Sequence, residues 1–305
     1  MKQTELQAFI PGIYPRSEAL VQATRDLDRG RTTQEAVDEQ VERDLAELVS
    51  AQQAAGLDLL ADGKLRWQDH FRPLLEATDG LATGALTRFL DTNTFYRAPE
   101  AAGDSPRLTA PLGERYIAML PRPRLVTLPS PFALSLGTPL SAATVAEGVL
   151  KPALEGLDAE LVVLAEPFLA REESPDISAL GEALEALRGP RLALWLSFGD
   201  AAPVLKRGVA DLPVDALGID FYATHLDALP EGFDKLLLAG VVDARNSLLE
   251  EPRELAAFAE QLQGRGVEQV ALVPNGDLQY VSEPIAREKL ARLGKAKTAT
   301  TEAAA

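Results

Sequence analysis

An unbroken apolar run, Leu-Leu-Leu-Ala-Gly-Val-Val at residues 236–242, is the feature that most constrains the fold. A strand whose side chains are apolar on both faces is typical of a parallel sheet covered by helices. The run stops abruptly at Asp243, Arg245 and Asn246. Because ligands bind at the carboxyl ends of parallel strands, these three polar residues are the first candidates for a binding site.

Further short apolar runs alternate with segments of helical periodicity along the chain. We expect strands at residues 6–13, 57–61, 125–128, 161–165, 192–196, 216–219, 236–242 and 269–273. We expect helices at residues 17–29, 33–55, 142–155, 177–187, 201–210, 254–262 and 284–293, with a short one near 227–234. Strand–helix alternation implies parallel pairing with right-handed crossovers. Eight such strands predict a closed (β/α)8 TIM barrel.

The domain organisation follows from length and from the breaks in this pattern. With 305 residues, 46% of them hydrophobic, the chain can form one large barrel, which we place at residues 1–294. Residues 71–122 lack the regular pattern, and we interpret them as a long insertion over the barrel mouth. Residues 295–305 contain no large apolar side chain and are expected to be a disordered tail.

Charge and composition exclude several classes of function. A formal net charge of -16 opposes binding to nucleic acid or to an anionic membrane. The chain has no long apolar run for a membrane span and no apolar signal region at its start, so we expect a cytoplasmic protein. It contains no cysteine, which excludes disulfides, thiolate zinc ligands and cysteine nucleophiles.

Polar and aromatic residues follow the predicted strands and also interrupt the insertion. A barrel would bring them to one mouth, although they are dispersed in sequence. The candidate ligand-binding residues are Arg16, Asp62, Lys64, Trp67, Asp69, His70, Asp91, Asn93, Tyr96, Glu166, Asp220, Tyr222, Asp243, Arg245 and Asn246. Arginine matches carboxylates, and Asp and Asn satisfy amines. We therefore expect a small anionic or amide-bearing organic ligand, and we assign no catalytic residue.

Some of these residue types have a structural interpretation as well, and the sequence leaves both open. Ser130, Asn275 and Asp277 stand where polar side chains commonly cap the next helix. Asp243 and Arg245 can form a structural ion pair. His70 can serve as a supporting group and Trp67 as a loop-packing residue.

Four segments resemble the cobalamin-independent methionine synthase family. They are residues 12–16, 56–63 with 67–70, 89–100 and 240–246. The resemblance implies a tandem of two (β/α)8 barrels, of which the C-terminal one carries a zinc that activates homocysteine for methylation from 5-methyltetrahydropteroyl-polyglutamate. This chain is one barrel long and most similar to the N-terminal, zinc-free barrel. The resemblance also implies that Arg16 lies near the anionic tail of the folate.

The zinc ligands of the family are one histidine, two cysteines and one glutamate, and this chain departs from that set. The matching positions read Trp195-Leu-Ser-Phe-Gly199, Asp220 and Asn275-Gly-Asp277. We therefore expect no metal site and name no certain cofactor.

Three hypotheses about function follow. The first is a methyltransferase of the methionine synthase family that acts on a methylated folate and homocysteine, or on a similar donor and acceptor, without the family's zinc ligands. The second is a non-catalytic folate-binding or docking barrel that partners a separate zinc-bearing barrel. The third is an enzyme like uroporphyrinogen decarboxylase, which shares the barrel and needs no metal.

Overall fold

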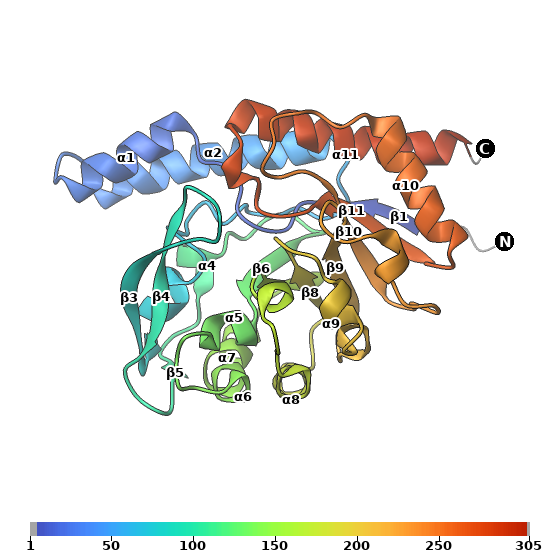
Figure 1. Cartoon of the computed structure of the whole chain (residues 1–305). Coiled ribbons are helices and arrows are strands. Elements are labelled where there is room, and N and C mark those ends of the chain that lie inside the picture. Colours follow the sequence, from blue (N-terminus) through green and yellow to red (C-terminus); the bar gives the residue numbers. More distant parts are fainter. Residues whose placement is uncertain (1–4, 304–305) are drawn as a thin grey trace.

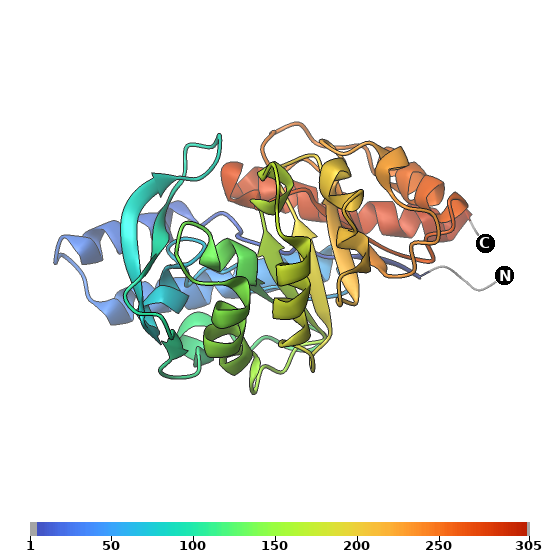
Figure 2. The ribbon, with the colours of Figure 1, turned by 60° about the horizontal axis from the view of Figure 1, so that its bottom comes forward.

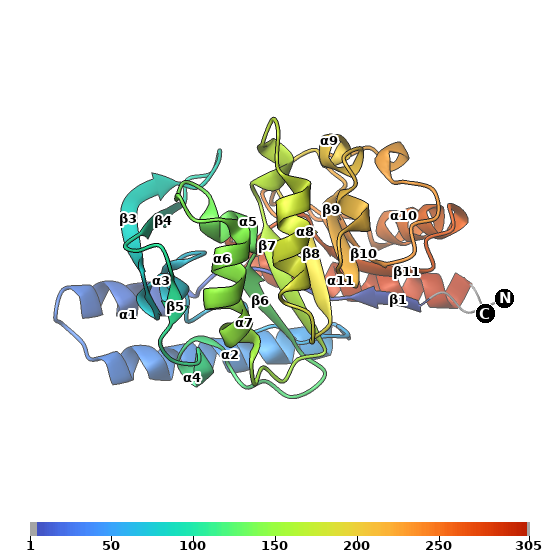
Figure 3. The same ribbon diagram turned by 90° about the horizontal axis from the view of Figure 1, so that it is seen from below.

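The computed structural model describes residues 5–303, which form an α/β fold around a curled parallel sheet (Figures 1 and 3). The strand order is β1-β11-β10-β9-β8-β7-β6, with parallel pairing throughout. The strands are β1 (Glu5–Ala8), β6 (Leu125–Pro129), β7 (Leu161–Glu166), β8 (Leu192–Leu196), β9 (Ala216–Asp220), β10 (Leu236–Val242) and β11 (Gln269–Pro274). The parallel α/β class predicted from the alternating pattern is confirmed.

Helices cover the sheet along its two sides, with α2, α10 and α11 on one side and α5 to α9 on the other (Figure 1). The helices outside the insertion are α1 (Glu18–Asp28), α2 (Gln34–Ala54), α5 (Pro131–Ser135), α6 (Ala142–Val145), α7 (Lys151–Leu154), α8 (Ile177–Glu185), α9 (Ala202–Leu205), α10 (Pro252–Gly264) and α11 (Glu283–Ala303). Short helical turns are η1 (Ala146–Leu150), η2 (Leu169–Arg171), η3 (Val209–Asp211), η4 (Leu226–Ala228) and η5 (Leu278–Tyr280). Thr33 caps α2 by accepting the Ala36 N–H, and threonine is among the residues preferred at this position.

The insertion is more ordered than the sequence predicts. It contains α3 (Arg72–Glu76), β2 (Thr78–Asp79), β3 (Leu81–Arg88), β4 (Phe95–Ala101), β5 (Arg107–Leu108) and α4 (Gly113–Tyr116). β3 and β4 form an antiparallel hairpin, which stands beside the sheet in Figure 2. Most residues of β4 are exposed or half-buried, so its sequence lacks the apolar alternation by which a strand is recognised.

The second predicted strand, residues 57–61, is present only as two isolated parallel bridges. Leu59 pairs with Phe9 beyond β1, and Leu60 pairs with Arg124 before β6. The Leu60 N–H donates to the Pro123 carbonyl at 3.0 Å, and the Leu125 N–H donates to the Leu60 carbonyl at 2.9 Å. The segment thus lies between the two edge strands of the seven-stranded sheet. A closed eight-stranded barrel is not confirmed.

Gln52 of α2 completes the hydrogen bonding of this short segment. Its side chain is fully buried, donates to the Ala61 carbonyl at 2.8 Å and accepts the Ala61 N–H at 2.9 Å. In a regular sheet, the N–H and carbonyl groups of Ala61 would pair with a neighbouring strand. Here the side-chain amide of Gln52 takes the place of that strand. The helix therefore holds the end of the segment from which the loop of residues 62–70 departs.

The end of the chain also differs from the expectation. α11 continues to Ala303, so the predicted disorder is wrong for residues 295–303, while 304–305 lie outside the described residues. Ala296 is buried, and Lys297 Nζ donates to the Gly56 carbonyl and to Asp58, both at 2.8 Å. A small side chain and a lysine can dock a helix without any large apolar residue.

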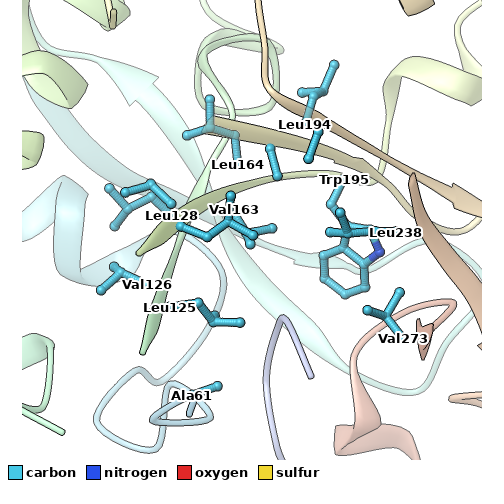
Figure 4. Packing of buried hydrophobic residues seen from close by; sticks show 14 of the residues in the cluster. Ala61, Leu125, Val126, Leu128, Val163, Leu164, Leu194, Trp195, Leu238 and Val273 are labelled. Carbon is cyan, nitrogen blue, oxygen red and sulfur yellow. The ribbon is translucent and has the colours of Figure 1, made fainter. Parts of the chain in front are cut away.

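The core consists mainly of Leu and Val side chains of neighbouring strands, and Figure 4 shows several of them in contact range of one another. Val163, Leu164, Leu194 and Trp195 are at most 1% exposed. Each such side chain contributes about 1.5–3 kcal/mol on burial, so the strands hold the sheet together largely through this packing. Within residues 5–303, no helix combines the length and the apolar character that a membrane crossing requires.

Replacing Gln52 should destabilise the protein strongly. Gln52→Leu keeps the volume but leaves the buried N–H and carbonyl of Ala61 without partners, so we expect a loss of about 2–4 kcal/mol in the free energy of unfolding. Urea denaturation of the wild type and the variant measures this loss. The exposed neighbour Gln53 provides the control, and Gln53→Leu should change stability by less than about 0.5 kcal/mol. Equal effects of the two substitutions would contradict the role of Gln52.

Candidate ligand-binding site

Lys64 is the most unusual polar residue of the loop that follows the bridged segment. It is 3% exposed, has a left-handed backbone (φ 50°), and its Nζ lies 3.8 Å from the centre of the Trp67 ring. Burial lowers the pKa of Lys64 to about 8, against the opposing attraction of Asp277 and Asp62. Asp62 accepts the backbone N–H groups of Lys64 and Ala118, and burial raises its pKa.

His70 and Asp277 lie next to this lysine. His70 Nε2 is 3.6 Å from Asp277 Oδ2 and is buried without a hydrogen-bond partner among the described residues. Burial, helped by the charge of Lys64, lowers the pKa of His70 to about 3, so the imidazole is neutral near pH 7. Burial raises the pKa of Asp277 to about 6. Burial thus shifts the pKa values of Lys64 and Asp277 toward each other, because it disfavours the charged form of both groups.

Asp69 and Trp67 of the same loop use their polar atoms within the protein. Asp69 Oδ1 accepts the Phe71 and Arg72 N–H groups, both at 2.8 Å, and its Oδ2 accepts the Arg97 N–H of β4 at 2.9 Å. Trp67 is 1% exposed and donates to the Tyr116 carbonyl at 2.9 Å. Asp69 therefore fastens the hairpin to the start of α3, and Trp67 packs the loop.

Glu166, at the end of β7, is fully buried and braces two loops. It accepts the Ser130 hydroxyl, the Ala133 N–H at 3.1 Å, and the Phe168 and Leu169 N–H groups at 2.9 Å. Burial raises its pKa, and these hydrogen bonds oppose that rise. Ser130 also caps α5 through the Ala133 N–H, as its alternative interpretation predicts.

Asp220 and Asn275 connect the ends of β9, β10 and β11. Asn275 donates to Asp220 Oδ1 at 3.0 Å, and its Oδ1 accepts the Ala244 N–H at 2.9 Å. The other oxygen of Asp220, Oδ2, is buried without a hydrogen-bond partner among the described residues, and burial raises the pKa of this group. Asn275 therefore links strand ends instead of capping a helix. Asp277, likewise, makes no capping bond to η5 and accepts the Ile13 N–H at 2.8 Å.

The residues after β10 lie nearer the surface. Asp243 Oδ1 accepts the Arg245 N–H and Asn246 Oδ1 accepts the Leu248 N–H, both at 3.0 Å. The guanidinium of Arg245 pairs with Asp91 at 3.7 Å and not with Asp243. Tyr222 is exposed on one side, and its hydroxyl donates to Glu250 Oε1 at 3.3 Å. Partial desolvation, followed by the charge of Glu250, raises the pKa of Tyr222.

The tip of the β3–β4 hairpin contacts this edge of the sheet. Phe89 is fully buried, with its ring stacked on His70 at a centroid distance of 4.1 Å. The centre of the Tyr96 ring lies 5.9 Å from that of the Phe89 ring, and burial raises the pKa of Tyr96. Asn93 is exposed and accepts from Arg88 at 3.3 Å. The tip of the hairpin thus covers His70 with an aromatic side chain. We call the edge of the sheet where His70 and the strand ends meet the mouth of the sheet.

Arginines line a cavity of about 400 Å³ beside the loop of residues 62–70, which we call the outer cavity. Arg16, Arg66 and Arg115 line it together with residues of α1 and α2. No hydrogen bond or ion pair joins the guanidinium of Arg16 to another described residue, and burial lowers its pKa. Arg66 pairs with Glu42 but keeps a buried Nε without a partner. Asp38 and Glu76 line the same cavity, so its wall carries arginines together with two carboxylates.

The structure thus separates the predicted residues into groups. Lys64, His70, Asp62 and Asp69 cluster at the mouth, Arg16 lies at the outer cavity, and Asp91 and Arg245 pair at the hairpin tip. Two basic residues of these sites went unnoticed in the sequence. Arg171, which pairs with Asp91, follows β7 and therefore stands after a strand end, like the residues that the sequence identified. Arg115 lies in the irregular insertion, where no pattern marks it.

The residues present do not fit the zinc of the family. The chain lacks cysteine, and the structure of residues 5–303 contains no group of three or more His, Cys, Asp or Glu placed to hold a metal ion. At the matching positions Asp220 bonds to Asn275, while Trp195 is buried in the core. An aromatic ring and an amide are poor zinc ligands, so no chemical step of this chain is derived through zinc.

The fold defines a parallel α/β protein in which polar side chains gather at the strand ends. Residues 144–266 match the family model described as "Cobalamin-independent synthase, N-terminal domain". The 5-methyltetrahydropteroyltriglutamate–homocysteine methyltransferase of Mycobacterium tuberculosis (strain H37Rv) is 29% identical over 286 residues, covering 77% of this chain and 37% of that protein. The protein of the same name from Streptomyces avermitilis is 32% identical over 228 residues, covering 64% and 29%.

Solved structures agree with this relationship at the level of the fold. A B12-independent methionine synthase from Shewanella sp. W3-18-1, in complex with selenomethionine, has a TM-score of 0.72 at 16% identity and covers 99% of this chain and 98% of that chain. The putative vitamin-B12 independent methionine synthase of Listeria monocytogenes has a TM-score of 0.73 at 16% identity, with 97% and 98% covered.

The resemblance to the cobalamin-independent methionine synthase family, through its N-terminal domain, is therefore confirmed. The chain spans about a third of the length of the curated relatives it matches.

The buried carboxyl group of Asp277 should make stability depend on pH. Its pKa in the folded protein is raised to about 6, so its contribution is fully present below about pH 4 and is lost as the pH rises through 6. The free energy of unfolding of the wild type minus that of Asp277→Asn should fall between pH 4 and pH 7, by about 3 kcal/mol at most. Denaturant titrations at each pH measure it. The same difference for the exposed Asp104→Asn should stay flat, and a flat profile for Asp277→Asn would contradict the raised pKa.

Proposed function

We propose that this chain binds a folate with an oligoglutamate tail and serves as the binding barrel beside a zinc-bearing partner barrel in methyl transfer. The observation that carries the proposal is the arginine-lined cavity of about 400 Å³. Three guanidinium groups, with the carboxylates of Asp38 and Glu76, border one cavity in a chain whose net charge is -16. The relatives are named for a substrate that carries three glutamates, and successive carboxylates suit successive arginines.

Arg16 supports this assignment because its charge is only partly compensated. Asp69 and Asp44 attract it at a distance, yet no described group accepts a hydrogen bond from its guanidinium. A partly buried guanidinium without acceptors is costly, and a ligand carboxylate would supply them. The cavity also contains Gln34 and Gln68, whose amides can bond to a peptide-linked tail.

Methyl transfer to homocysteine would require that another protein activates the homocysteine thiol. Zinc supplies that activation in the family, and the residues of this chain do not fit it. A separate barrel with the histidine, cysteine and glutamate ligands would complete the reaction, while this chain holds the tail of the donor. A methyltransferase that acts without a partner, an enzyme like uroporphyrinogen decarboxylase and a cytoplasmic location stay predictions that no observation favours further.

The fold is proposed to be a (β/α)8 barrel in which residues 57–61 take the second strand position, with residues 1–294 as one domain. The two bridges, to Phe9 and to Arg124, support this because they connect the edge strands of the curled sheet. Such closure would bring the arginine cavity and the mouth cluster to the two sides of one loop, residues 62–70.

Removing the charge of Arg16 should weaken binding of the tail. For Arg16→Gln we expect the Kd for pteroyltriglutamate to rise about 10- to 100-fold, the range for losing a charge-assisted hydrogen bond. The Kd for pteroylmonoglutamate should change less, because it has fewer carboxylates to lose. Isothermal titration calorimetry at two salt concentrations measures both.

The matched control is Arg25→Gln, on an exposed position of α1 outside the cavity. It should leave the Kd for pteroyltriglutamate unchanged. The proposal fails if wild-type protein binds the triglutamate no more tightly than the monoglutamate.

The need for a partner is tested by activity. We expect the purified chain to make no methionine from homocysteine and 5-methyltetrahydropteroyltriglutamate, even with added zinc, and to stimulate a zinc-bearing barrel supplied in trans. Mass spectrometry of the product gives the readout. Methionine formed by the chain alone would contradict the division of labour and favour the lone methyltransferase.

A further inference from the structure

We propose that the mouth of the sheet is a second ligand site, for a small planar carboxylic acid, which Phe89 and Asp91 of the chain itself occupy in this structure. The site goes beyond the proposed function because it shares no residue with the arginine cavity. It is built from loops that follow β7, β8, β10 and β11, at the edge where parallel sheets bind ligands. The β3–β4 hairpin supplies the occupants.

The first half of the site is a flat slot, filled by the ring of Phe89. This ring is nearly parallel to those of His70 (centroids 4.1 Å apart, 18°) and Tyr280 (6.4 Å, 10°). It is nearly perpendicular to Phe198 (5.5 Å, 88°). Stacked and edge-on aromatic partners suit any planar ring of similar size, so the slot is not specific to a phenylalanine side chain.

The second half is a pair of arginines, occupied by the carboxylate of Asp91. Arg171 Nη2 lies 3.8 Å and Arg245 Nη1 3.7 Å from its oxygens. Both guanidinium groups are positioned without Asp91, because Arg171 Nε donates to the Phe198 carbonyl at 2.8 Å and Arg245 lies over the Phe198 ring at 5.2 Å. Two preplaced cations facing one carboxylate make an anion subsite that a ligand can take over.

Asp91 is the weakly retained occupant, whereas Phe89 is fully buried, so a ligand ring has to take over the contacts of Phe89 in the slot. Both ion pairs of Asp91 are solvent-exposed, and exposed pairs contribute little stability. Leu90, between the two occupants, has a left-handed backbone (φ 49°), a costly conformation for this residue type. Within the hairpin strand β4, which has seven residues, most are exposed or half-buried. A ligand with a ring and a carboxylate would replace both sets of contacts and release this strain.

Competition between Asp91 and a ligand carboxylate can be measured with benzoate as the probe. Asp91→Asn removes the competitor while the arginines stay, so we expect it to bind benzoate about five-fold more tightly than the wild type, the factor that matches one weak exposed ion pair. Asp104→Asn makes the same change of charge at an exposed position outside the site and should bind benzoate as the wild type does. Benzyl alcohol, which lacks the carboxylate, should show no difference between the three proteins.

Two further measurements separate the slot from a general charge effect. Saturating benzoate should speed hydrogen–deuterium exchange at residues 89–94 of the wild type, because the hairpin tip leaves the mouth. Arg171→Gln combined with Arg245→Gln should abolish the preference for benzoate over benzyl alcohol, whereas Arg16→Gln should leave it intact even if it loses folate binding. Equal benzoate affinity of Asp91→Asn and Asp104→Asn, or unchanged exchange of the hairpin, would overturn the proposal.

Discussion

The junction between the two edges of the sheet is the constraint on which the rest of the structure depends. Within residues 5–303, two isolated backbone bridges, from Leu59 to Phe9 and from Leu60 to Arg124, join the β1 edge of the sheet to the β6 edge. The amide of Gln52 satisfies the backbone beyond them. The Gln52 side chain of α2 thus provides the backbone hydrogen bonds that a neighbouring strand provides in the rest of the sheet. The loop of residues 62–70 leaves from this point, so the junction decides where the mouth cluster and the arginine cavity lie.

Burial, more than charge, sets the chemistry of that loop. Desolvation lowers the pKa values of Lys64 and His70 and raises that of Asp277 to about 6, and the neutral imidazole lies 3.6 Å from the Asp277 carboxyl group. The aromatic hairpin tip deepens this burial by stacking Phe89 on His70. The outer cavity differs, because Arg16 forms no hydrogen bond to a described residue, and Arg66, although paired with Glu42, keeps a buried Nε without a partner.

Sequence reasoning succeeded where a residue's position followed from periodicity, and it failed where the contact was non-local. The strands at residues 192–196 and 236–242 have the predicted bounds, because buried apolar runs leave one choice of structure. The hairpin was missed because most residues of β4 are exposed or half-buried, and the helix through residues 295–303 because the contacts that dock it include a small alanine and a lysine. Arg245 was found as a strand-end residue, but its partner Asp91 comes from a distant segment.

By itself, the sequence determined the parallel α/β class, the family resemblance and the absence of thiolate zinc ligands, since each depends on residue types in local order. Only the tertiary structure decided how those residues are used. It showed that Asp69, Glu166 and Asp220 bond to neighbouring loops, and that Arg16 keeps free donors beside a cavity. The physical reason is that hydrogen-bond satisfaction and desolvation depend on groups far apart in the chain, which local pattern does not encode.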